Sequence, residues 1–431
     1  MKRIEMQELI RWKNSIDRKP LIIRGARQVG KTWLMKEFGR QNYPFTAYIN
    51  FESNPALKEL FRSNYDISRI ITALEIETGI KIQSDNTLII LDEIQEAEGA
   101  LTSLKYFKEN APQFHILAGG SLLGVAIHSK YSFPVGKVEF LNLYPLAFPE
   151  FLTAMGEGKL VELLKNQDWP LVTSFKTRYQ DLLRQYYYVG GMPEAVLSFS
   201  QKKDFHAVRQ IQQAILTAYE QDFSKHAPAA IVPRIRMLWN SIPSQLAKEN
   251  RKFLYSLLRS GARAKEYEQA ITWLMDCGLI YKVHNITKPG MPLKAFEDIG
   301  AFKLFVLDVG LMAAMTSLDV KTLLGGNEIF IEFKGALTEQ YVLQQLLMNK
   351  LDAIYYWAPE NSRAEIDFVI QLKGQIVPIE VKAEENLRAK SLLIYQDKYA
   401  PKTSIRTSMS DYRKDESIEN IPLYGISELA N

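Results

Sequence analysis

The feature that most constrains the fold is a glycine-rich motif at residues 25–32. The motif reads G-A-R-Q-V-G-K-T and matches the pattern G-x-x-x-x-G-K-[ST]. An apolar run at 21–24 precedes it, and an amphipathic stretch at 33–38 follows it. A strand, a glycine-rich turn and a helix in this order predict a phosphate-binding loop, whose backbone N–H groups and helix N-terminus face an anion. The alternative is an ordinary glycine-containing turn before a helix, and the complete motif and both flanks favour the phosphate loop.

Two side chains of the motif carry specific chemistry. Lys31 is expected to place a positive charge on the β- and γ-phosphates, and Thr32 to offer its hydroxyl to Mg²⁺. The sequence therefore predicts binding of ATP or GTP with Mg²⁺. The predicted nucleotide-contacting residues are Gly25, Ala26, Arg27, Gln28, Val29, Gly30, Lys31 and Thr32.

Two carboxylates follow a second apolar run at residues 88–91. They are Asp92 and Glu93, and the carboxyl ends of buried strands are where open α/β sheets bind ligands. We expect Asp92 to hold Mg²⁺ through water and Glu93 to activate the attacking water as the catalytic base. The alternative for Glu93 is an acid that the dipole of a following helix favours.

A third apolar run, at residues 114–118, leads to Gly119, Gly120 and Ser121. A hydroxyl at this strand tip is suited to sensing the γ-phosphate, and Ser121 is a predicted nucleotide contact. Serine is also a common helix N-cap, and both interpretations remain open.

The order of these runs predicts the fold class and the domain organisation. In the first ~200 residues short apolar runs alternate with helical patterns, which is typical of a parallel α/β sheet. The middle of the chain is helical, and a mixed α/β pattern returns after residue 288. We expect domains at 1–203, 204–288 and 289–431, in keeping with about one domain per 150 residues.

Composition excludes several classes of protein. The single cysteine, Cys277, excludes disulfide scaffolds and cysteine-rich zinc sites, and it fits a reducing cytosol, so a cytoplasmic location is expected. The first residues lack the apolar core of a signal peptide, and no stretch reaches the ~18 apolar residues of a membrane helix. The formal net charge of +4 permits binding to nucleic acid without arguing for it.

The helical middle has the outline of a winged helix. Residues 253–259 predict a helix, 260–262 a turn, 264–275 a second helix and 279–283 a strand. A winged helix can place its second helix in a DNA groove, and the nearby cations are Arg251, Lys252, Arg259, Arg263 and Lys265. The alternative is a structural linker with a solvated charged face.

A β-hairpin is predicted late in the chain. Segments 365–372 and 375–382 flank Lys373-Gly374, a turn that suits a two-residue hairpin loop. Pairing Leu372 with Gln375 makes all paired numbers sum to 747, which opposes Asp367 to Glu380 and Glu365 to Lys382. Alternation then places these four charged side chains on one face, with apolar residues on the other.

Opposed carboxylates repel unless a cation lies between them. Two acids that hold Mg²⁺ beside a lysine that positions water form a metal-dependent phosphodiesterase site. This arrangement resembles the PD-(D/E)xK nuclease core, which implies a further acid, Glu339, from a preceding helix. The expected metal ligands are Glu339, Asp367 and Glu380, with Lys382 catalytic, and the alternative is an exposed hairpin with ordinary charges.

The motifs together resemble the prokaryotic AAA-type ATPases that carry a C-terminal DUF4143 region. Besides residues 25–32 and 88–95, the resemblance rests on segments 136–146, 190–194, 302–311, 365–367 and 379–382. It implies an α/β fold with an AAA-type P-loop ATPase domain, a winged-helix middle and a C-terminal α/β restriction-endonuclease-like domain. Residues 118–120 read A-G-G where the family usually has T-G-S.

A second departure concerns Lys137, which occupies a position where the family usually has arginine. The resemblance makes Lys137 a predicted nucleotide contact, but lysine is a weaker, non-bidentate substitute, so slow hydrolysis is expected. The first functional hypothesis is an ATPase with a nuclease-like domain that acts on DNA, in mobile-element or defence functions as the resemblance suggests. The rival is a nucleotide-dependent switch whose C-terminal region binds a partner without cleavage.

Overall fold

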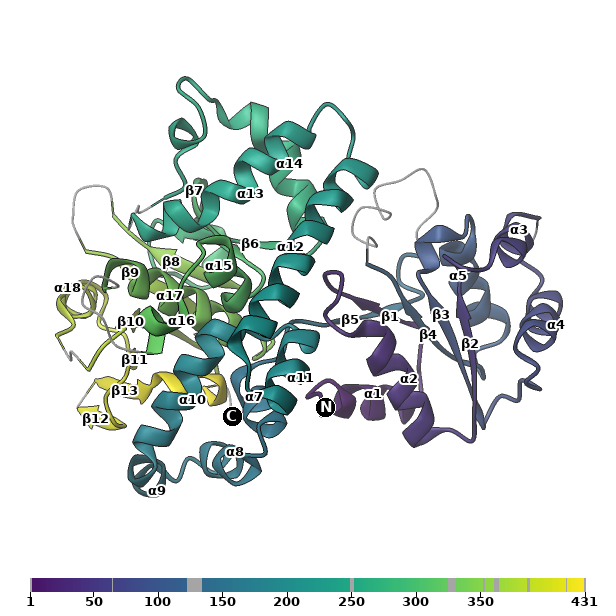
Figure 1. Ribbon diagram of the computed structural model, residues 1–431, viewed down its shortest axis with the longest axis horizontal. Helices are drawn as coiled ribbons and strands as arrows, with labels where there is room; N and C mark the ends of the chain where they lie inside the picture. Colours follow the sequence, from purple (N-terminus) through teal and green to yellow (C-terminus); the bar gives the residue numbers. More distant parts are fainter. Residues whose placement is uncertain are drawn as a thin grey trace. The chain divides into compact units, whose positions relative to one another are not determined.

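The computed structural model describes residues 2–63, 65–121, 134–248, 252–324, 331–351, 353–359, 364–385, 388–415 and 417–429. The chain packs as two compact units (Figure 1). The N-terminal unit comprises Lys2–Tyr144 and Asp276–Leu279, and the C-terminal unit comprises Pro145–Met275 and Ile280–Asn431. The domain borders expected near residues 203 and 288 stay predictions, because compactness alone does not define a domain.

A five-stranded parallel sheet forms the centre of the N-terminal unit. Its strand order is β2-β3-β4-β1-β5. The strands are β1 Leu21–Arg24, β2 Phe45–Asn50, β3 Thr87–Asp92, β4 His115–Gly119 and β5 Glu139–Asn142. The three predicted apolar runs, at 21–24, 88–91 and 114–118, coincide with β1, β3 and β4 to within one residue, which confirms the predicted parallel α/β fold.

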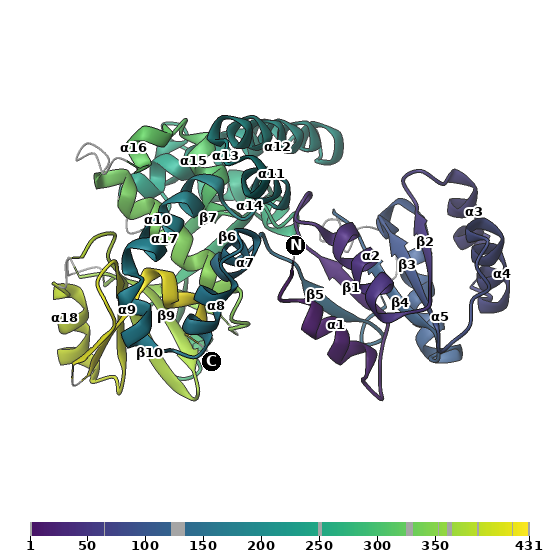
Figure 2. The ribbon, with the colours of Figure 1, turned by 60° about the horizontal axis from the view of Figure 1, so that its bottom comes forward.

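Helices cover both faces of this sheet (Figures 1 and 2). They are α1 Met6–Lys13, α2 Lys31–Asn42, α3 Pro55–Ser63, α4 Ile67–Thr78 and α5 Ala100–Asn110, with a 3₁₀ turn η1 at Ile94–Glu96. On the face covered by α3 to α5, Ile22, Ile89 and Ile116 of three strands pack with Leu74 of α4 and Leu104 of α5. This buried layer keeps the strands in register, so that their carboxyl ends stay together.

An eight-stranded mixed sheet forms the centre of the C-terminal unit, in the order β12-β13-β11-β10-β9-β8-β6-β7. The strands are β6 Ile280–Ile286, β7 Glu297–Val306, β8 Ile354–Trp357, β9 Ile366–Leu372, β10 Gln375–Val381, β11 Ser404–Ser408, β12 Arg413–Asp415 and β13 Ile418–Pro422. β10 is antiparallel to β9 and parallel to β11. A mixed sheet in this region agrees with the predicted α/β class.

Helices of the C-terminal unit pack on this sheet and on one another (Figure 2). They are α7 Phe148–Ala154, α8 Gly158–Lys165, α9 Trp169–Ser174, α10 Lys176–Val189, α11 Pro193–Lys202, α12 Phe205–His226, α13 Val232–Ala247, α14 Ala264–Asp276, α15 Val309–Met315, α16 Val320–Leu324, α17 Ile331–Leu347 and α18 Lys390–Tyr399. Short 3₁₀ turns are η2 Tyr255–Leu257, η3 Leu293–Phe296 and η5 Leu423–Glu428. Among the described helices, none is long and apolar enough to cross a membrane.

The helical middle corrects one prediction. The second predicted helix is present as α14, but the first, at residues 253–259, is reduced to the 3₁₀ turn η2. The Phe253 N–H donates to the Phe302 carbonyl of β7 at 2.7 Å, and the Leu254 N–H donates to Gln245 Oε1 at 2.8 Å. These donors are therefore used by tertiary contacts. The strand after α14 pairs with β7 and joins the large sheet, and the winged-helix assignment stays a prediction.

Three of the family-like motifs meet in a buried hub of the C-terminal unit. The Gly191 N–H donates to Asp308 Oδ2 at 2.6 Å, while the Leu146 N–H donates to the Gly191 carbonyl at 2.7 Å. A Cβ at Gly191 would lie 2.1 Å from the Leu146 carbonyl oxygen, so a side chain there would displace the backbone. Burial raises the pKa of the Asp308 carboxyl, and the hydrogen bonds from Gly191 and Leu311 oppose the shift. These motifs have a structural role.

Candidate functional site: a P-loop and an acidic cluster

The P-loop connects β1 to α2, as the sequence predicted. Gly25 has φ of 153°, and a Cβ there would lie 2.2 Å from the Leu143 carbonyl oxygen, so close backbone packing requires glycine. Gly30 caps α2 in a left-handed conformation, and Gln28 also has a positive φ of 68°. The loop thus brings residues 25–30 to the N-terminus of α2, where backbone N–H groups and the helix dipole favour an anion.

Arg3 supports this loop from below and was missed by the sequence analysis. Its guanidinium donates to the Val29 carbonyl at 3.1 Å and to the Tyr144 carbonyl at 2.7 Å, and it pairs with Glu5. Arg3 is only 7% exposed. Nothing in the spacing around Arg3 links it to the loop, because the contact depends on how the N-terminal segment folds back.

Lys31 is nearly buried, with 6% of its surface exposed. Its Nζ donates to the carbonyls of Gly25 at 2.9 Å and Ala26 at 2.7 Å. Burial lowers the pKa of Lys31 to about 8, and the Glu93 and Asp92 carboxylates partly oppose this shift. The ammonium is therefore held by neutral acceptors, and an anionic ligand would stabilise its charged form.

The two predicted Mg²⁺-holding residues are in direct contact. Thr32 Oγ1 donates to Asp92 Oδ2 at 2.7 Å, and the Tyr48 hydroxyl donates to the same oxygen at 3.0 Å. Asp92 is 1% exposed at the end of β3. A hydroxyl and a carboxylate are the oxygen ligands that Mg²⁺ prefers, so these residues fit the predicted metal.

Glu93 and Ser121 are brought together at the tips of neighbouring strands. Glu93 Oε2 accepts hydrogen bonds from the Ser121 N–H and Oγ, both at 3.1 Å, and from Gln95 Nε2 at 2.6 Å. Glu93 also has a positive φ of 48°. The carboxylate predicted as the base is thus held in one orientation by Ser121 and by Gln95, which the sequence analysis did not single out.

Lys137 does not join this group. It precedes β5, whose first residue, Glu139, pairs with Leu21 at the start of β1. Leu21 lies four residues before Gly25, a rise of about 13 Å in an extended strand. Lys137 pairs instead with Glu109 at 3.0 Å. Lys137 therefore lies at the amino ends of the parallel strands, whereas the P-loop follows the carboxyl end of β1, so its ammonium is not at the P-loop of the same chain.

The C-terminal hairpin has the predicted register. Leu372 pairs with Gln375, and the pairing continues to Phe368 with Ile379, so every pair sums to 747. Beyond this point the backbone ladder stops, and Asp367 Oδ2 accepts the Val381 N–H at 2.7 Å. The convergence of the Asp367 and Glu380 carboxylates stays a prediction.

Lys303 of β7 lies among the acids of this region, and the sequence analysis did not assign it a role. Its Nζ contacts Glu365 Oε1 at 2.5 Å and Glu339 Oε2 of α17 at 3.2 Å. Burial alone would lower the pKa of Lys303, but the carboxylates of Glu339, Glu365 and Asp367 raise it above its usual value. A lysine in an apolar strand segment, F-K-L-F-V, is the signal that could have pointed to a buried ammonium with acidic partners.

The carboxyl of Asp367 responds to the same cluster. Burial raises its pKa well above the usual value, the Glu339 and Glu365 carboxylates add to the shift, and Lys303 opposes it. We call Lys303, Glu339, Glu365 and Asp367 the acidic cluster. It contains two of the three predicted metal ligands, Glu339 and Asp367.

The other two predicted residues form a separate contact. Lys382 Nζ pairs with Glu380 Oε1 at 2.8 Å, and Glu380 is 3% exposed. Glu380 Oε2 has no hydrogen-bond partner among the described residues. A search of the described residues finds no group of three or more His, Cys, Asp or Glu side chains that could hold a metal ion. The set Glu339, Asp367 and Glu380 therefore stays a prediction.

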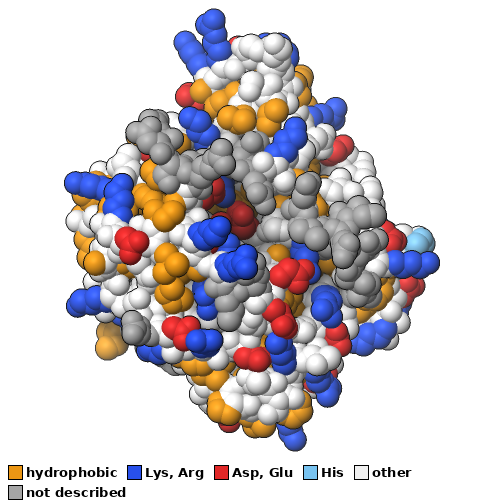
Figure 3. All heavy atoms as spheres, turned by 90° about the vertical axis from the view of Figure 1, so that its left-hand side faces the viewer, with side chains coloured by type: hydrophobic (Ala, Val, Ile, Leu, Met, Phe, Trp, Pro, Cys, Tyr) orange, Lys and Arg blue, Asp and Glu red, His pale blue; other side chains and the backbone are white. Residues whose placement is uncertain are grey.

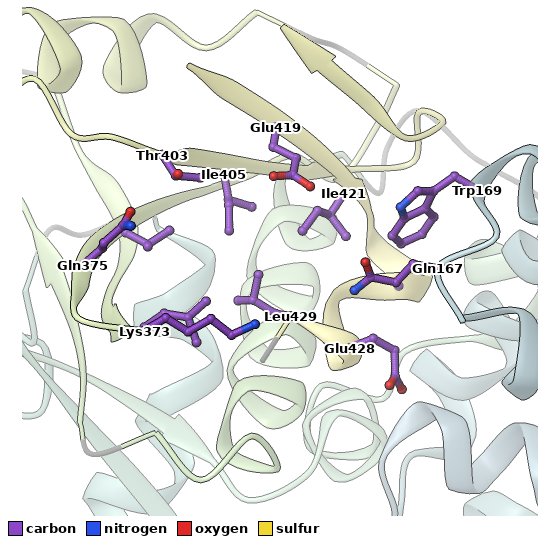
Figure 4. Close-up of a pocket in the computed structure, with 13 residues that line it drawn as sticks. Gln167, Trp169, Lys373, Gln375, Thr403, Ile405, Glu419, Ile421, Glu428 and Leu429 are labelled. Atoms are coloured by element: carbon purple, nitrogen blue, oxygen red, sulfur yellow. The ribbon is translucent and has the colours of Figure 1, made fainter. Parts of the chain in front are cut away.

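The C-terminal unit also has a face with many charged side chains (Figure 3) and, elsewhere, a small pocket. Figure 3 shows this face, with acidic side chains in a hollow near the centre and Lys and Arg side chains around them. Elsewhere, a pocket of about 220 Å³ lies between the sheet and η5, with Lys373, Glu419 and Trp169 among its lining residues (Figure 4). No member of the acidic cluster lines this pocket, so the two features are separate.

Three family models match separate segments of the chain. Residues 17–152 match the AAA domain family AAA_14. Residues 180–322 and 334–426 match DUF8612 and DUF4143, two domains of unknown function. No curated protein matches the chain.

Three solved structures are similar to the chain at low identity. The Walker-type ATPase PABY2304 of Pyrococcus abyssi is 15% identical with a TM-score of 0.46, covering 73% of this chain and 95% of that one. PCH-2 of C. elegans is 13% identical with a TM-score of 0.23, and the match covers 37% of this chain and 46% of that one. The Aeropyrum pernix ORC1 protein in complex with DNA is 12% identical with a TM-score of 0.27, and the match covers 74% of this chain and 93% of that one. These TM-scores are too low to support a functional conclusion. The family matches show that the chain combines an AAA-type P-loop ATPase domain with a C-terminal DUF4143 domain.

Proposed function

We propose that this protein binds ATP with Mg²⁺ at residues 25–32 and hydrolyses it. The observation that carries the proposal is the 2.7 Å hydrogen bond from Thr32 Oγ1 to Asp92 Oδ2, which joins the two halves of the predicted site. Lys31 lies next to Thr32, with its ammonium on backbone carbonyls that a phosphate can replace. This is the arrangement that a nucleotide with a divalent cation needs.

Each residue has a proposed part in the reaction. Thr32 and Asp92 would hold Mg²⁺, which neutralises charge on the phosphates. Lys31 would turn from the Gly25 and Ala26 carbonyls to the β- and γ-phosphates. Glu93 would take a proton from the attacking water. Ser121, which contacts the Glu93 carboxylate, would connect the γ-phosphate to the orientation of that base. Because Lys137 is not at the P-loop, we expect slow hydrolysis by an isolated chain.

We further propose that DNA is the partner of the ATPase. Arg259, Arg263 and Lys265 are exposed at and before the N-terminus of α14. Arg259 pairs with Glu266 at 3.3 Å, an exposed ion pair that costs little to exchange for a phosphate. Lys252 is also exposed, and Arg251 lies outside the described residues. The rival is a structural linker, in which these cations only interact with solvent.

Two measurements on the purified protein test the ATPase and its partner. ATP turnover with and without duplex DNA should show a DNA-stimulated rate, and no turnover in either condition would contradict the enzymatic proposal. Replacing Arg259, Arg263 and Lys265 by alanine should weaken DNA binding and reduce the slope of log affinity against log salt by about one unit per lost phosphate contact. A wild-type slope in the triple variant would leave this segment as a linker.

A second candidate activity concerns the C-terminal unit. Metal-dependent cleavage of DNA would need Glu339, Asp367 and Glu380 to hold Mg²⁺ and Lys382 to position the water. The confirmed register of β9 and β10 supports the nuclease-like arrangement, whereas the contacts of Lys303 favour the rival, a switch that binds a partner without cleavage. Incubation of plasmid DNA with Mg²⁺ or Mn²⁺ separates them, since nicking abolished by Asp367→Asn would establish cleavage.

A further inference from the structure

The acidic cluster already contains a cation, the Lys303 ammonium. Its Nζ lies 2.5 Å from Glu365 Oε1 and 3.2 Å from Glu339 Oε2, and only 7% of the residue is exposed. A lysine ammonium has three N–H donors, and carboxylates are its strongest acceptors. Charge attraction from Asp367 adds to these two contacts. The ammonium is therefore both buried and neutralised at this position.

The strand that carries Lys303 fixes its place. β7 pairs with β6, and Lys303 lies opposite Val283 in that ladder. Both neighbours of Lys303 in the strand, Phe302 and Leu304, are buried, and the Nζ lies 5.5 Å from the ring centre of Tyr356. A buried charge this well enclosed is costly to move, because it would have to leave its acids and pass apolar side chains.

A divalent ion held by Glu339 and Asp367 would compete with the Lys303 ammonium, which contacts Glu339 Oε2 and is attracted by the Asp367 carboxylate. Mg²⁺ binds carboxylate oxygens at about 2.0–2.1 Å, so it would lie where the ammonium lies, and two cations cannot share that volume. Lys382, the lysine expected to assist a metal, contacts Glu380, which is not a member of the acidic cluster. The lysine inside the acids thus comes from β7 and not from the hairpin.

We propose that Lys303 is a built-in cation that occupies the acidic cluster and keeps divalent metal out of it. The C-terminal unit then uses these acids to hold Lys303 in place, and it acts on its partner without metal-dependent cleavage. This inference rests on the second candidate activity of the C-terminal unit, decides it in favour of the non-cleaving rival, and is independent of ATP hydrolysis.

The test compares Mn²⁺ binding in nucleotide-free protein by electron paramagnetic resonance. Wild type and Asp367→Asn should bind Mn²⁺ equally weakly. Lys303→Met should gain a saturable site with at least a tenfold lower Kd, and Lys303→Met/Asp367→Asn should lose it. Lys334→Met is the matched control, because Lys334 pairs with Glu384 outside the cluster, and it should gain no site.

Two results would overturn the proposal. One is a Mn²⁺ site in wild type that Asp367→Asn abolishes, which would show that metal enters despite Lys303 and would support the nuclease. The other is a folded Lys303→Met protein that gains no site. Loss of ATP turnover affects neither result, so failure of the ATPase proposal is read separately.

A second measurement applies if Lys303→Met does not fold. Reductive methylation of wild-type protein, followed by mass spectrometry of its peptides, reports whether the Lys303 amine is accessible. We expect Lys303 to remain unmethylated to the same extent with and without Mn²⁺, while exposed lysines react. A Mn²⁺-dependent rise in methylation of Lys303 would show that metal displaces it, and would contradict the proposal.

Discussion

Two buried lysines, Lys31 and Lys303, differ in their partners more than in their burial. They are 6% and 7% exposed, so burial disfavours the charge of both. Lys31 donates to neutral carbonyls and its pKa falls to about 8, whereas Lys303 contacts carboxylates and its pKa rises. A buried lysine held by neutral acceptors is suited to an external anion. One held by carboxylates already has its counter-ions, so we propose a ligand site for the buried lysine of one unit and a structural contact for that of the other.

The largest expected effect is on ATP turnover, which should depend on the Glu93 carboxylate of the N-terminal unit and not on the Asp367 carboxylate of the C-terminal unit. Glu93→Gln should bind ATP but lose turnover by about 10²- to 10⁴-fold, because the amide cannot accept the proton of the water. Asp367→Asn should leave turnover unchanged. Steady-state phosphate release under saturating ATP measures both variants. Equal turnover in wild type and Glu93→Gln would remove Glu93 as the base.

Stability should distinguish the two lysines. Lys303→Met leaves the partly buried carboxylates of Glu339 and Glu365 without their cation and should destabilise the protein by up to about 3–5 kcal/mol. Lys31→Met removes a buried charge that has no carboxylate contact, so it should be neutral or stabilising in nucleotide-free protein. Urea unfolding followed by circular dichroism provides the comparison, with Arg413→Met of the exposed Arg413–Asp415 pair as a control near zero. Equal losses in both lysine variants would contradict the contrast.

His115 is a third buried base, and like Lys31 it has a neutral hydrogen-bond partner. Its Nδ1 lies 2.6 Å from the Tyr43 hydroxyl, and burial lowers its pKa to about 4, with help from Arg18 and Lys13. Because the unfolded chain takes up this proton near pH 6.5 and the folded protein resists it until about pH 4, stability is lost as pH falls through this window.

The loss attributable to His115 should approach about 2.5 kcal/mol at pH 4.5. Unfolding free energies at pH 7.5 and 4.5 measure it as the difference between wild type and His115→Gln, since other carboxylates titrate in both proteins. The same pH dependence in the two proteins would show that His115 is not held neutral by the fold.

Local patterns predicted local geometry well. The G-x-x-x-x-G-K-T motif with its flanks located β1, the loop and α2, and the Lys373-Gly374 turn fixed the hairpin register because a two-residue loop allows few pairings. The wrong helix at residues 253–259 failed because the Phe253 N–H donates to Phe302, a contact from a distant strand.

Contacts between residues far apart in the sequence were not predicted, because local patterns do not show which distant residues meet. Lys303 is 36 residues from Glu339 in the chain, and nothing in the local pattern selects which acids a buried lysine meets. Arg3 reaches the Val29 carbonyl only because the N-terminal segment folds back onto the loop. The sequence therefore pointed to Glu339 and Asp367 of the acidic cluster, but not to the cation that contacts the cluster's acids.

The most direct test of the account is calorimetric titration of ATP with Mg²⁺ into wild type and Lys31→Ala. Lys31→Ala removes the side-chain cation aimed at the phosphates, and loss of a charge-assisted hydrogen bond of about 1.5–3 kcal/mol predicts at least a roughly 10- to 150-fold weaker affinity. Arg40→Ala, which breaks an exposed pair on the same helix, is the control and should bind like wild type. Unchanged ATP affinity in a folded Lys31→Ala protein would contradict the claim that this buried lysine binds the phosphates of ATP.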